Sequence, residues 1–215
     1  MKRIMALSLV VLTIMSLACP VFATSGANED GLQEVNGVYI PVDAECAQEG
    51  EFAVYYNFYD PVNDMNYSFY NPVTGDHFAI SGPRNETVGN GARAVTITAH
   101  RYSFSSSYTV NGKHNGITFT LPAKKIYIRG NAEIVKEANG ENVTDYYEDG
   151  YQYTIQVKED VLLFPQSVKY TCIAGEYVYE SFEADGGTYY MIITPKDTME
   201  DWHRIVGSGE LYYYA

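Results

Sequence analysis

From Gly37 onward, short runs of apolar and aromatic residues alternate with polar turns rich in glycine. Within many runs every second position is apolar, which is the period of a β-strand with one buried face. Asn-Gly pairs recur between the runs and supply the positive φ angles that tight hairpins need. Since the runs follow one another without alternating helices, the pattern predicts an all-β fold. We expect an antiparallel β-sandwich of jelly-roll or immunoglobulin-like type, with a β-barrel as the alternative.

One segment near the C-terminus has the period of a helix instead. Thr198 can cap its start and Gly207 can end it. Between them the apolar residues recur at helical spacing: Met199, Trp202, and Ile205 or Val206. The sequence therefore predicts one short C-terminal helix, with the single tryptophan packed against the core.

A change of frame interrupts the long run that begins at Arg93. Its apolar residues occupy odd positions up to Ala99 and even positions from Tyr102 onward. An extra residue in the strand would bring both sets to one face. The pattern therefore predicts a β-bulge near His100–Ser103.

Nearly the same phrase occurs twice, as FYDPV from Phe58 and as FYNPV from Phe69. In both, an Asp or Asn precedes proline. Such a side chain can accept hydrogen bonds from the backbone that follows, while proline fixes φ. The repeat therefore predicts two matching turns of a three-stranded meander.

A single register for this meander pairs Tyr59 with Asn66 and Tyr70 with His77, and both loops then hold six residues. The large apolar side chains then share one face across three strands, as a buried face requires. The opposite face would carry the candidate ligand-binding residues Tyr55, Asn57, Tyr59, Ser68, Tyr70 and His77.

Within that face, Tyr55, Tyr70 and His77 would form one cross-strand row. Flat rings beside amides and hydroxyls suit a sugar, which can stack on the rings and form hydrogen bonds at the rim. The row therefore indicates a glycan-binding surface. The alternatives are a face covered by another sheet or loop, and an ordinary solvated face.

The stretch SFYNPVTGDHF resembles the Y-N-P-x-S/T-G-E/D-H-F segment of β-trefoil repeats in Gram-positive secreted and surface proteins. The tryptophan-containing segment that follows in those repeats has no counterpart here. The resemblance implies an extracellular bacterial protein, and we take neither a fold nor a site from it.

Residues 1–23 are typical of a secretory signal peptide: Lys2 and Arg3 precede an apolar run, and Val21-Phe22-Ala23 has the usual spacing of a cleavage site. The apolar run is too short to span a bilayer comfortably, so we expect cleavage after Ala23 and no integral membrane segment in the mature chain. The alternatives are a retained anchor and a lipid anchor on Cys19. Polar residues 24–36 predict a flexible segment before a single domain over 37–215.

Acidic side chains dominate the chain, whose formal net charge is −13. Cleavage after residue 23 would remove two basic and no acidic residues, leaving 12 basic against 27 acidic side chains and a charge of −15. Such a surface repels phosphate backbones and anionic lipid. Nucleic acid is therefore excluded as a partner.

Two cysteines, Cys46 and Cys172, remain after removal of the signal peptide. In an exported protein an even pair predicts a disulfide bond, and two buried free thiols are the alternative.

An acidic loop holds Asp145, Glu148 and Asp149, whose carboxylates offer the oxygen ligands that calcium prefers. A solvated charged loop is the alternative, and the sequence offers no motif for any other cofactor. It also offers no catalytic motif, and the four histidines are dispersed. We therefore expect a secreted, non-catalytic module that binds a cell-surface or wall glycan. The alternatives are an adhesive surface protein that binds other proteins and a hydrolase whose site is assembled from loops.

Overall fold

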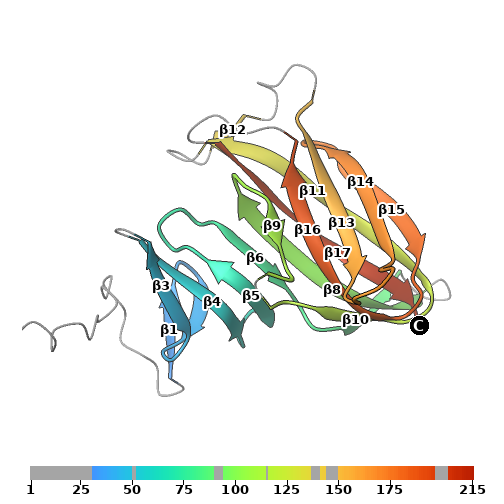
Figure 1. The fold of residues 1–215 in the computed structure, drawn as a ribbon, viewed down its shortest axis with the longest axis horizontal. Coiled ribbons are helices and arrows are strands. Elements are labelled where there is room, and N and C mark those ends of the chain that lie inside the picture. Colours follow the sequence, from blue (N-terminus) through green and yellow to red (C-terminus); the bar gives the residue numbers. More distant parts are fainter. Residues whose placement is uncertain are drawn as a thin grey trace, which may run out of the picture.

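A computed structural model describes residues 31–49, 52–89, 94–114, 116–136, 141–143, 150–196 and 203–215. In these residues the strands make up all of the regular structure, and each strand pairing is antiparallel. Two sheets face one another across a common core, as Figure 1 shows. The fold is therefore all-β and consistent with the predicted β-sandwich.

The larger sheet has ten strands. Its main path runs β12-β11-β17-β8-β6-β5-β4-β3, with β15 paired to β11 and β7 paired to β8. It is an open sheet that does not close into a barrel, because β12 and β3 stand at opposite ends of this path. The bounds are β3 (Glu45–Glu49), β4 (Phe52–Asp60), β5 (Met65–Tyr70), β6 (His77–Ile80), β7 (Arg84–Val88), β8 (Val95–Ser106), β11 (Lys125–Lys136), β12 (Glu141–Asn142), β15 (Tyr177–Glu183) and β17 (His203–Tyr214).

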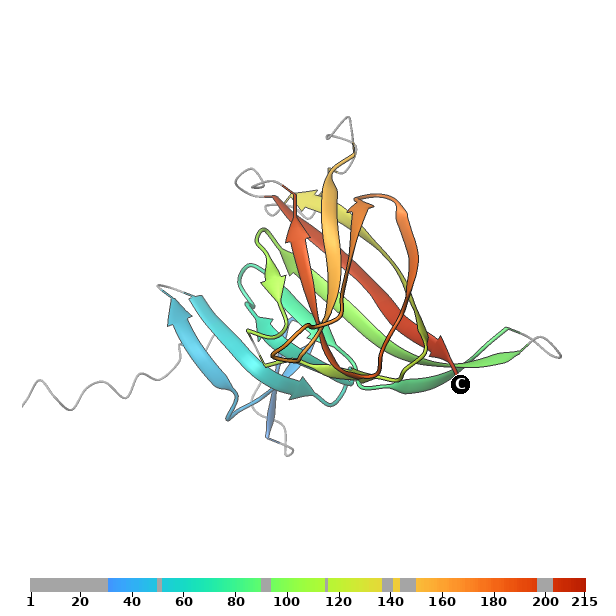
Figure 2. The same ribbon diagram turned by 45° about the vertical axis from the view of Figure 1, so that its right-hand side comes forward.

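The smaller sheet has five strands in the order β10-β16-β13-β14, with β9 paired to β16. Its bounds are β9 (Val110–Asn111), β10 (Phe119–Leu121), β13 (Gln152–Glu159), β14 (Ser167–Ile173) and β16 (Gly187–Pro195). A separate hairpin, β1 (Leu32–Val35) with β2 (Val38–Pro41), lies beside β4 at the N-terminal end of the larger sheet, on the left of Figure 2.

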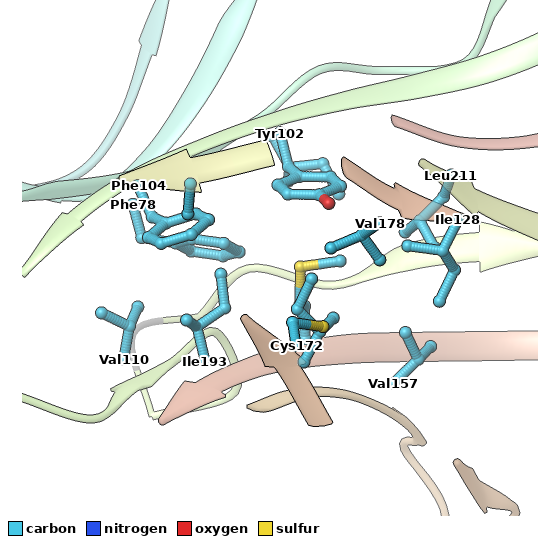
Figure 3. Close-up of a cluster of buried hydrophobic side chains, with 14 of the residues drawn as sticks. Phe78, Tyr102, Phe104, Val110, Ile128, Val157, Cys172, Val178, Ile193 and Leu211 are labelled. Carbon is cyan, nitrogen blue, oxygen red and sulfur yellow. The ribbon is translucent and has the colours of Figure 1, made fainter. Parts of the chain in front are cut away.

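The main core lies between the two sheets. Alternate residues of the larger sheet, such as Phe78, Phe104 and Ile128, face alternate residues of the smaller one, such as Val157 and Ile193 (Figure 3). The strands of both sheets thus show the period of two that the sequence pattern indicated.

Glycines in the centre of the larger sheet make room for two aromatic rings. A Cβ atom on Gly207 would lie 2.7 Å from Phe104 Cε1, and one on Gly209 would lie 2.6 Å from Tyr102 Cζ. Such distances are far shorter than any stable carbon–carbon contact. The rings therefore lie directly over the β17 backbone, where no other residue type fits.

The meander of β4, β5 and β6 confirms most of the predicted register. Tyr59 pairs with Asn66, and Tyr70 pairs with His77. The two turns are also alike. Asp60 Oδ1 accepts hydrogen bonds from the backbone N–H groups of the second and third residues after it, and Asn71 Oδ1 does the same in the second turn. The repeated phrase thus encodes two equivalent Asx turns.

The predicted C-terminal helix is wrong where the structure describes it. Residues 203–207 belong to β17, which pairs with β8 on one side and β11 on the other; the first part of the predicted helix, residues 198–202, lies outside the described residues. A strand paired on both sides satisfies its backbone groups and buries Ile205 completely. This tertiary pairing overrides the local capping and spacing signals.

The predicted bulge near His100–Ser103 is also wrong. Strand β8 keeps one register against β17 from Ile97 to Ser106. The frame changes because both faces of β8 are covered: Ile97 and Ala99 pack under Tyr212 on the outer face, while Tyr102 points into the main core. Between β5 and β6, by contrast, the register does shift, between Tyr67 and Phe69.

The predicted disulfide is wrong, because Cys46 and Cys172 are free cysteines. Cys46 lies on β3 at the far end of the larger sheet, whereas Cys172 lies on β14 of the smaller sheet and faces Tyr102 in the main core (Figure 3). Two thiols in separate parts of a sandwich cannot approach to bonding distance without moving backbone.

We expect Cys172 to react slowly with thiol reagents in the folded protein. Burial raises the pKa of its thiol to about 11, and only the thiolate is nucleophilic. At pH 8, alkylation of Cys172 should be at least about a hundredfold slower in the folded protein than in the unfolded chain, where the thiol titrates near pH 8.5. Peptide mapping after timed alkylation measures this ratio. Resistance of Cys46 and Cys172 to alkylation in denatured, unreduced protein would instead show a disulfide.

Only the last part of the predicted N-terminal segment, residues 24–36, lies in the described residues. Of the expected flexible segment, residues 24–30 lie outside the described residues, but Leu32–Val35 forms β1. The predicted signal peptide, residues 1–23, and Cys19 also lie outside them. The described residues contain no helix long and apolar enough to cross a membrane.

Candidate functional site

The predicted row exists as strand pairing but is not an open surface. Tyr55 pairs with Tyr70, and Tyr70 pairs with His77. However, Tyr70 is only 4% exposed, and its hydroxyl donates a hydrogen bond to the backbone oxygen of Val35. The β1–β2 hairpin covers the ring, with Ile40 completely buried in the same cluster.

A local irregularity explains why the row is covered. Asn57 has a φ of +50°, which is a left-handed conformation, and it lies opposite the register shift of β5. Along β4, Tyr55 faces the hairpin from an odd position before Asn57, whereas Phe58 faces it from an even position after Asn57. Phe58 and Tyr67 therefore join Tyr55 and Tyr70 in one small core, where Phe58 and Tyr67 stack at 4.9 Å.

The remaining predicted residues do not complete a platform. Ser68 is completely buried, Asn57 is exposed, and Tyr59 donates a hydrogen bond of 2.7 Å to Asp64. His77 is half-buried and its Nδ1 lies 2.9 Å from the Gly75 carbonyl oxygen. Burial lowers the pKa of His77, the Gly75 carbonyl raises it, and the charge of Arg204 lowers it further, so that the net shift is downward.

The predicted calcium ligands Asp145, Glu148 and Asp149 lie outside the described residues. Within the part of the chain that the structure describes, no group of three His, Cys, Asp or Glu side chains is placed to hold a metal ion.

A second aromatic surface lies on the same face of the larger sheet, around β11, β15 and β17. We call Tyr127, Tyr179, Tyr212 and Tyr214 the tyrosine surface. Tyr127 is paired with Tyr212 across two adjacent strands, and β15 brings Tyr179 to the other side of β11. Because residues of one strand alternate between faces, these rings all point away from the main core.

The rings of the tyrosine surface contact one another closely. Tyr127 and Tyr212 stack with centroids 5.2 Å apart and planes 17° apart. Tyr214 stands at 76° to Tyr127, and the Tyr212 hydroxyl donates to that of Tyr179 over 3.4 Å. Tyr212 is only 5% exposed, whereas Tyr179 and Tyr214 are 58% and 46% exposed. One buried ring, that of Tyr212, and one partly buried ring, that of Tyr127, thus support two open ones.

Charged side chains adjoin these rings. The Arg129 guanidinium lies 4.9 Å from the centre of the Tyr212 ring and donates a 3.0 Å hydrogen bond to Glu210. Lys125 lies over Tyr127, with its ammonium 5.5 Å from the ring centre. Burial first, and then the hydrogen bond to Tyr179, raises the pKa of Tyr212. Its phenol is therefore neutral at ordinary pH and can donate or accept hydrogen bonds.

A shallow hollow of about 270 Å³ adjoins the tyrosine surface, between it and the β7–β8 hairpin. Tyr212, Tyr214 and Arg129 line one part, and Val88 and Ile97 line another. Figure 2 shows this hairpin extending beside the C-terminus. Aromatic, apolar and charged groups thus meet at one open place on the sheet.

A larger cleft of about 370 Å³ contains His100 and is lined by Asn66, Ser81, Ile117 and Phe119 among others. His100 Nδ1 lies 3.1 Å from the Ser81 carbonyl oxygen, while Nε2 is buried and has no partner in hydrogen-bonding geometry. Burial lowers the pKa of His100 despite the opposing backbone contacts at Ser81 and Thr120. Among the described residues that line this cleft, none carries a carboxylate, ammonium or guanidinium group beside His100.

Sequence reasoning missed the tyrosine surface, although its signals are present. Tyr127 and Arg129 share one face of their strand, as do Tyr212 and Tyr214 of β17. The missing information was that β11, β15 and β17 are neighbours, which depends on pairings between segments far apart in the chain.

No model of a known protein family matches the chain, and a search of curated proteins finds no similar sequence.

Proposed function

We propose that this is an exported, non-catalytic module that binds a cell-surface or wall glycan through the tyrosine surface. The observation that carries the proposal is the pair of open rings, Tyr179 and Tyr214, held beside the buried ring of Tyr212 and the partly buried ring of Tyr127. This replaces the buried row of Tyr55, Tyr70 and His77 as the binding surface.

The geometry supports stacking together with polar recognition. The exposed ring faces offer flat apolar area to a pyranose, and their rotamers are restricted by the ring contacts, so little entropy is lost on binding. Around them, the Tyr179 hydroxyl, Arg129 and Glu210 supply hydrogen-bond donors and acceptors for sugar hydroxyls. The shallow hollow leaves space for a chain of sugars to continue along the sheet.

The net charge narrows the ligand class. A chain with a formal charge of −13 repels polyanionic glycans over long range. We therefore expect a neutral polysaccharide, for which stacking and hydrogen bonds provide the affinity.

Replacing Tyr179 by alanine should weaken glycan binding by about tenfold or more, because exposed aromatic anchors dominate such interfaces. Stability should change little, since the ring is 58% exposed. The wild-type protein is first screened on a glycan array, and the strongest neutral ligand is then titrated into both proteins by calorimetry.

Tyr108→Ala is the matched control, because Tyr108 is 76% exposed and lies outside the tyrosine surface. It should bind like the wild type. If the Tyr179→Ala and Tyr108→Ala variants bound the glycan with equal affinity, the tyrosine surface would not be the binding surface. Absence of any bound glycan in the screen would contradict the function itself.

A further inference from the structure

The loop between β13 and β14 exposes consecutive apolar side chains. Leu162, Leu163 and Phe164 are 98%, 77% and 96% exposed, and Val161 is 43% exposed. Single exposed apolar residues are common on protein surfaces, but a run of fully exposed large ones is not. We call residues 161–164 the apolar tip.

The base of this loop is firmly held. Glu159 and Gln166 face each other across it: the Glu159 N–H donates to the Gln166 carbonyl over 2.9 Å, and the Gln166 N–H donates to the Glu159 carboxylate over 3.1 Å. The Gln166 side chain also accepts a hydrogen bond from Tyr189 over 2.7 Å and donates to the Glu183 carbonyl. The apolar tip is therefore held out by a hydrogen-bonded frame.

The backbone at the end of the tip has a conformation that is costly for a large residue. Phe164 has a φ of +53°, in the left-handed region that bulky side chains rarely adopt. Such local strain persists only where the surrounding structure maintains it. Here it accompanies an orientation in which the ring has almost no contact with the rest of the molecule.

The shape of the tip favours a lipid surface over a protein partner. A specific protein interface buries roughly 800 Å² on each side and needs a complementary shape, which four residues at the end of a hairpin do not provide. A bilayer interface adapts to a convex apolar tip, and insertion removes leucine and phenylalanine side chains from water without matched packing.

The charges select the kind of lipid. The acidic side chain nearest the tip, Asp160, forms an ion pair with Lys113, so its charge is partly neutralised. The whole chain, however, carries a formal charge of −13 and repels anionic headgroups. The chemistry therefore fits a zwitterionic surface, such as phosphatidylcholine.

We propose that the apolar tip inserts Leu162, Leu163 and Phe164 into the interface of a zwitterionic bilayer and docks the protein peripherally. This proposal stands independently of glycan binding, because it uses the opposite sheet and different residues.

The test is flotation of the protein with phosphatidylcholine vesicles. The wild type should float with the vesicles, and the double variant Leu162→Ser, Phe164→Ser should bind at least about tenfold more weakly, since each buried side chain of this size contributes more than a tenfold factor. Adding phosphatidylglycerol to the vesicles should weaken binding at low salt. Thermal unfolding should be almost unchanged, because the replaced side chains are exposed.

The control double variant Val62→Ser, Val73→Ser removes two exposed apolar side chains from other turns and should float like the wild type. Failure of the wild type to float would overturn the proposal, as would equal flotation of the tip variant or stronger binding to anionic vesicles. A second copy of the chain is the remaining candidate partner of the tip, and sedimentation velocity tests for it. Self-association that depends on the tip, without flotation, would assign the tip to a second copy and overturn lipid docking.

Discussion

Tyr70→Ala should lower the free energy of unfolding by about 3 kcal/mol, the range for removing a buried aromatic ring. Tyr70 is 4% exposed, packs with Tyr67 and Ile40 beneath the β1–β2 hairpin, and donates its hydroxyl hydrogen to the Val35 carbonyl. Its removal would leave a cavity between the hairpin and the larger sheet. Urea unfolding followed by circular dichroism measures the loss.

Tyr59→Ala is the matched control, on the neighbouring strand. Tyr59 is 44% exposed, and its hydroxyl donates a hydrogen bond to Asp64 at the surface. Its replacement should cost less than about 1 kcal/mol. If Tyr70→Ala were as mild as Tyr59→Ala, the hairpin would not cover this face, and the predicted row could bind a ligand after all.

Gly209→Ala should be at least as destabilising, by about 3 kcal/mol or more, because the added methyl group has no space to move into. It would overlap the Arg129 backbone oxygen and the Tyr102 ring at once. Relief requires either separation of β11 from β17 or displacement of a ring that is only 2% exposed. Thermal unfolding of the purified variant, or its failure to accumulate in folded form, reports the effect.

Gly82→Ala provides the comparison. No atom lies within 4 Å of the Cβ position at Gly82, and its φ is outside the left-handed region. The substitution should leave stability unchanged or raise it slightly, because alanine restricts the unfolded chain. A similar loss for Gly82→Ala and Gly209→Ala would show that backbone flexibility, rather than the contact with Tyr102, decides the outcome.

The fold class and the local meander could be predicted because their signals are local. Alternating polarity marks the strands, and the Asx-Pro phrases at Asp60 and Asn71 fix two turns and hence the pairings of Tyr59 and Tyr70. A register of this kind follows from turn length and from the need to bury one face.

The errors arose where distant segments decide the environment. Whether Tyr70 is open depends on a hairpin formed by residues 32–41, and whether residues 203–207 are helical depends on pairing with β8 and β11. The two cysteines fail to meet for the same reason, since Cys172 lies in the main core and Cys46 lies on β3 at the end of the larger sheet. A single sequence does not state which strands are neighbours, so the tyrosine surface could not be assembled from it.

The position of β17 has a consequence for how the molecule is made. This strand follows every other strand in the chain, yet it lies between β8 and β11 in the middle of the larger sheet. During synthesis or translocation, β8 and β11 therefore emerge with unpaired edges. The sheet becomes continuous only when β17, which ends at Tyr214, has emerged and paired with both. Unpaired edges invite association with other chains, and contacts this distant in sequence form slowly. We therefore expect folding to be completed only after the last strand is released, with aggregation as the competing process.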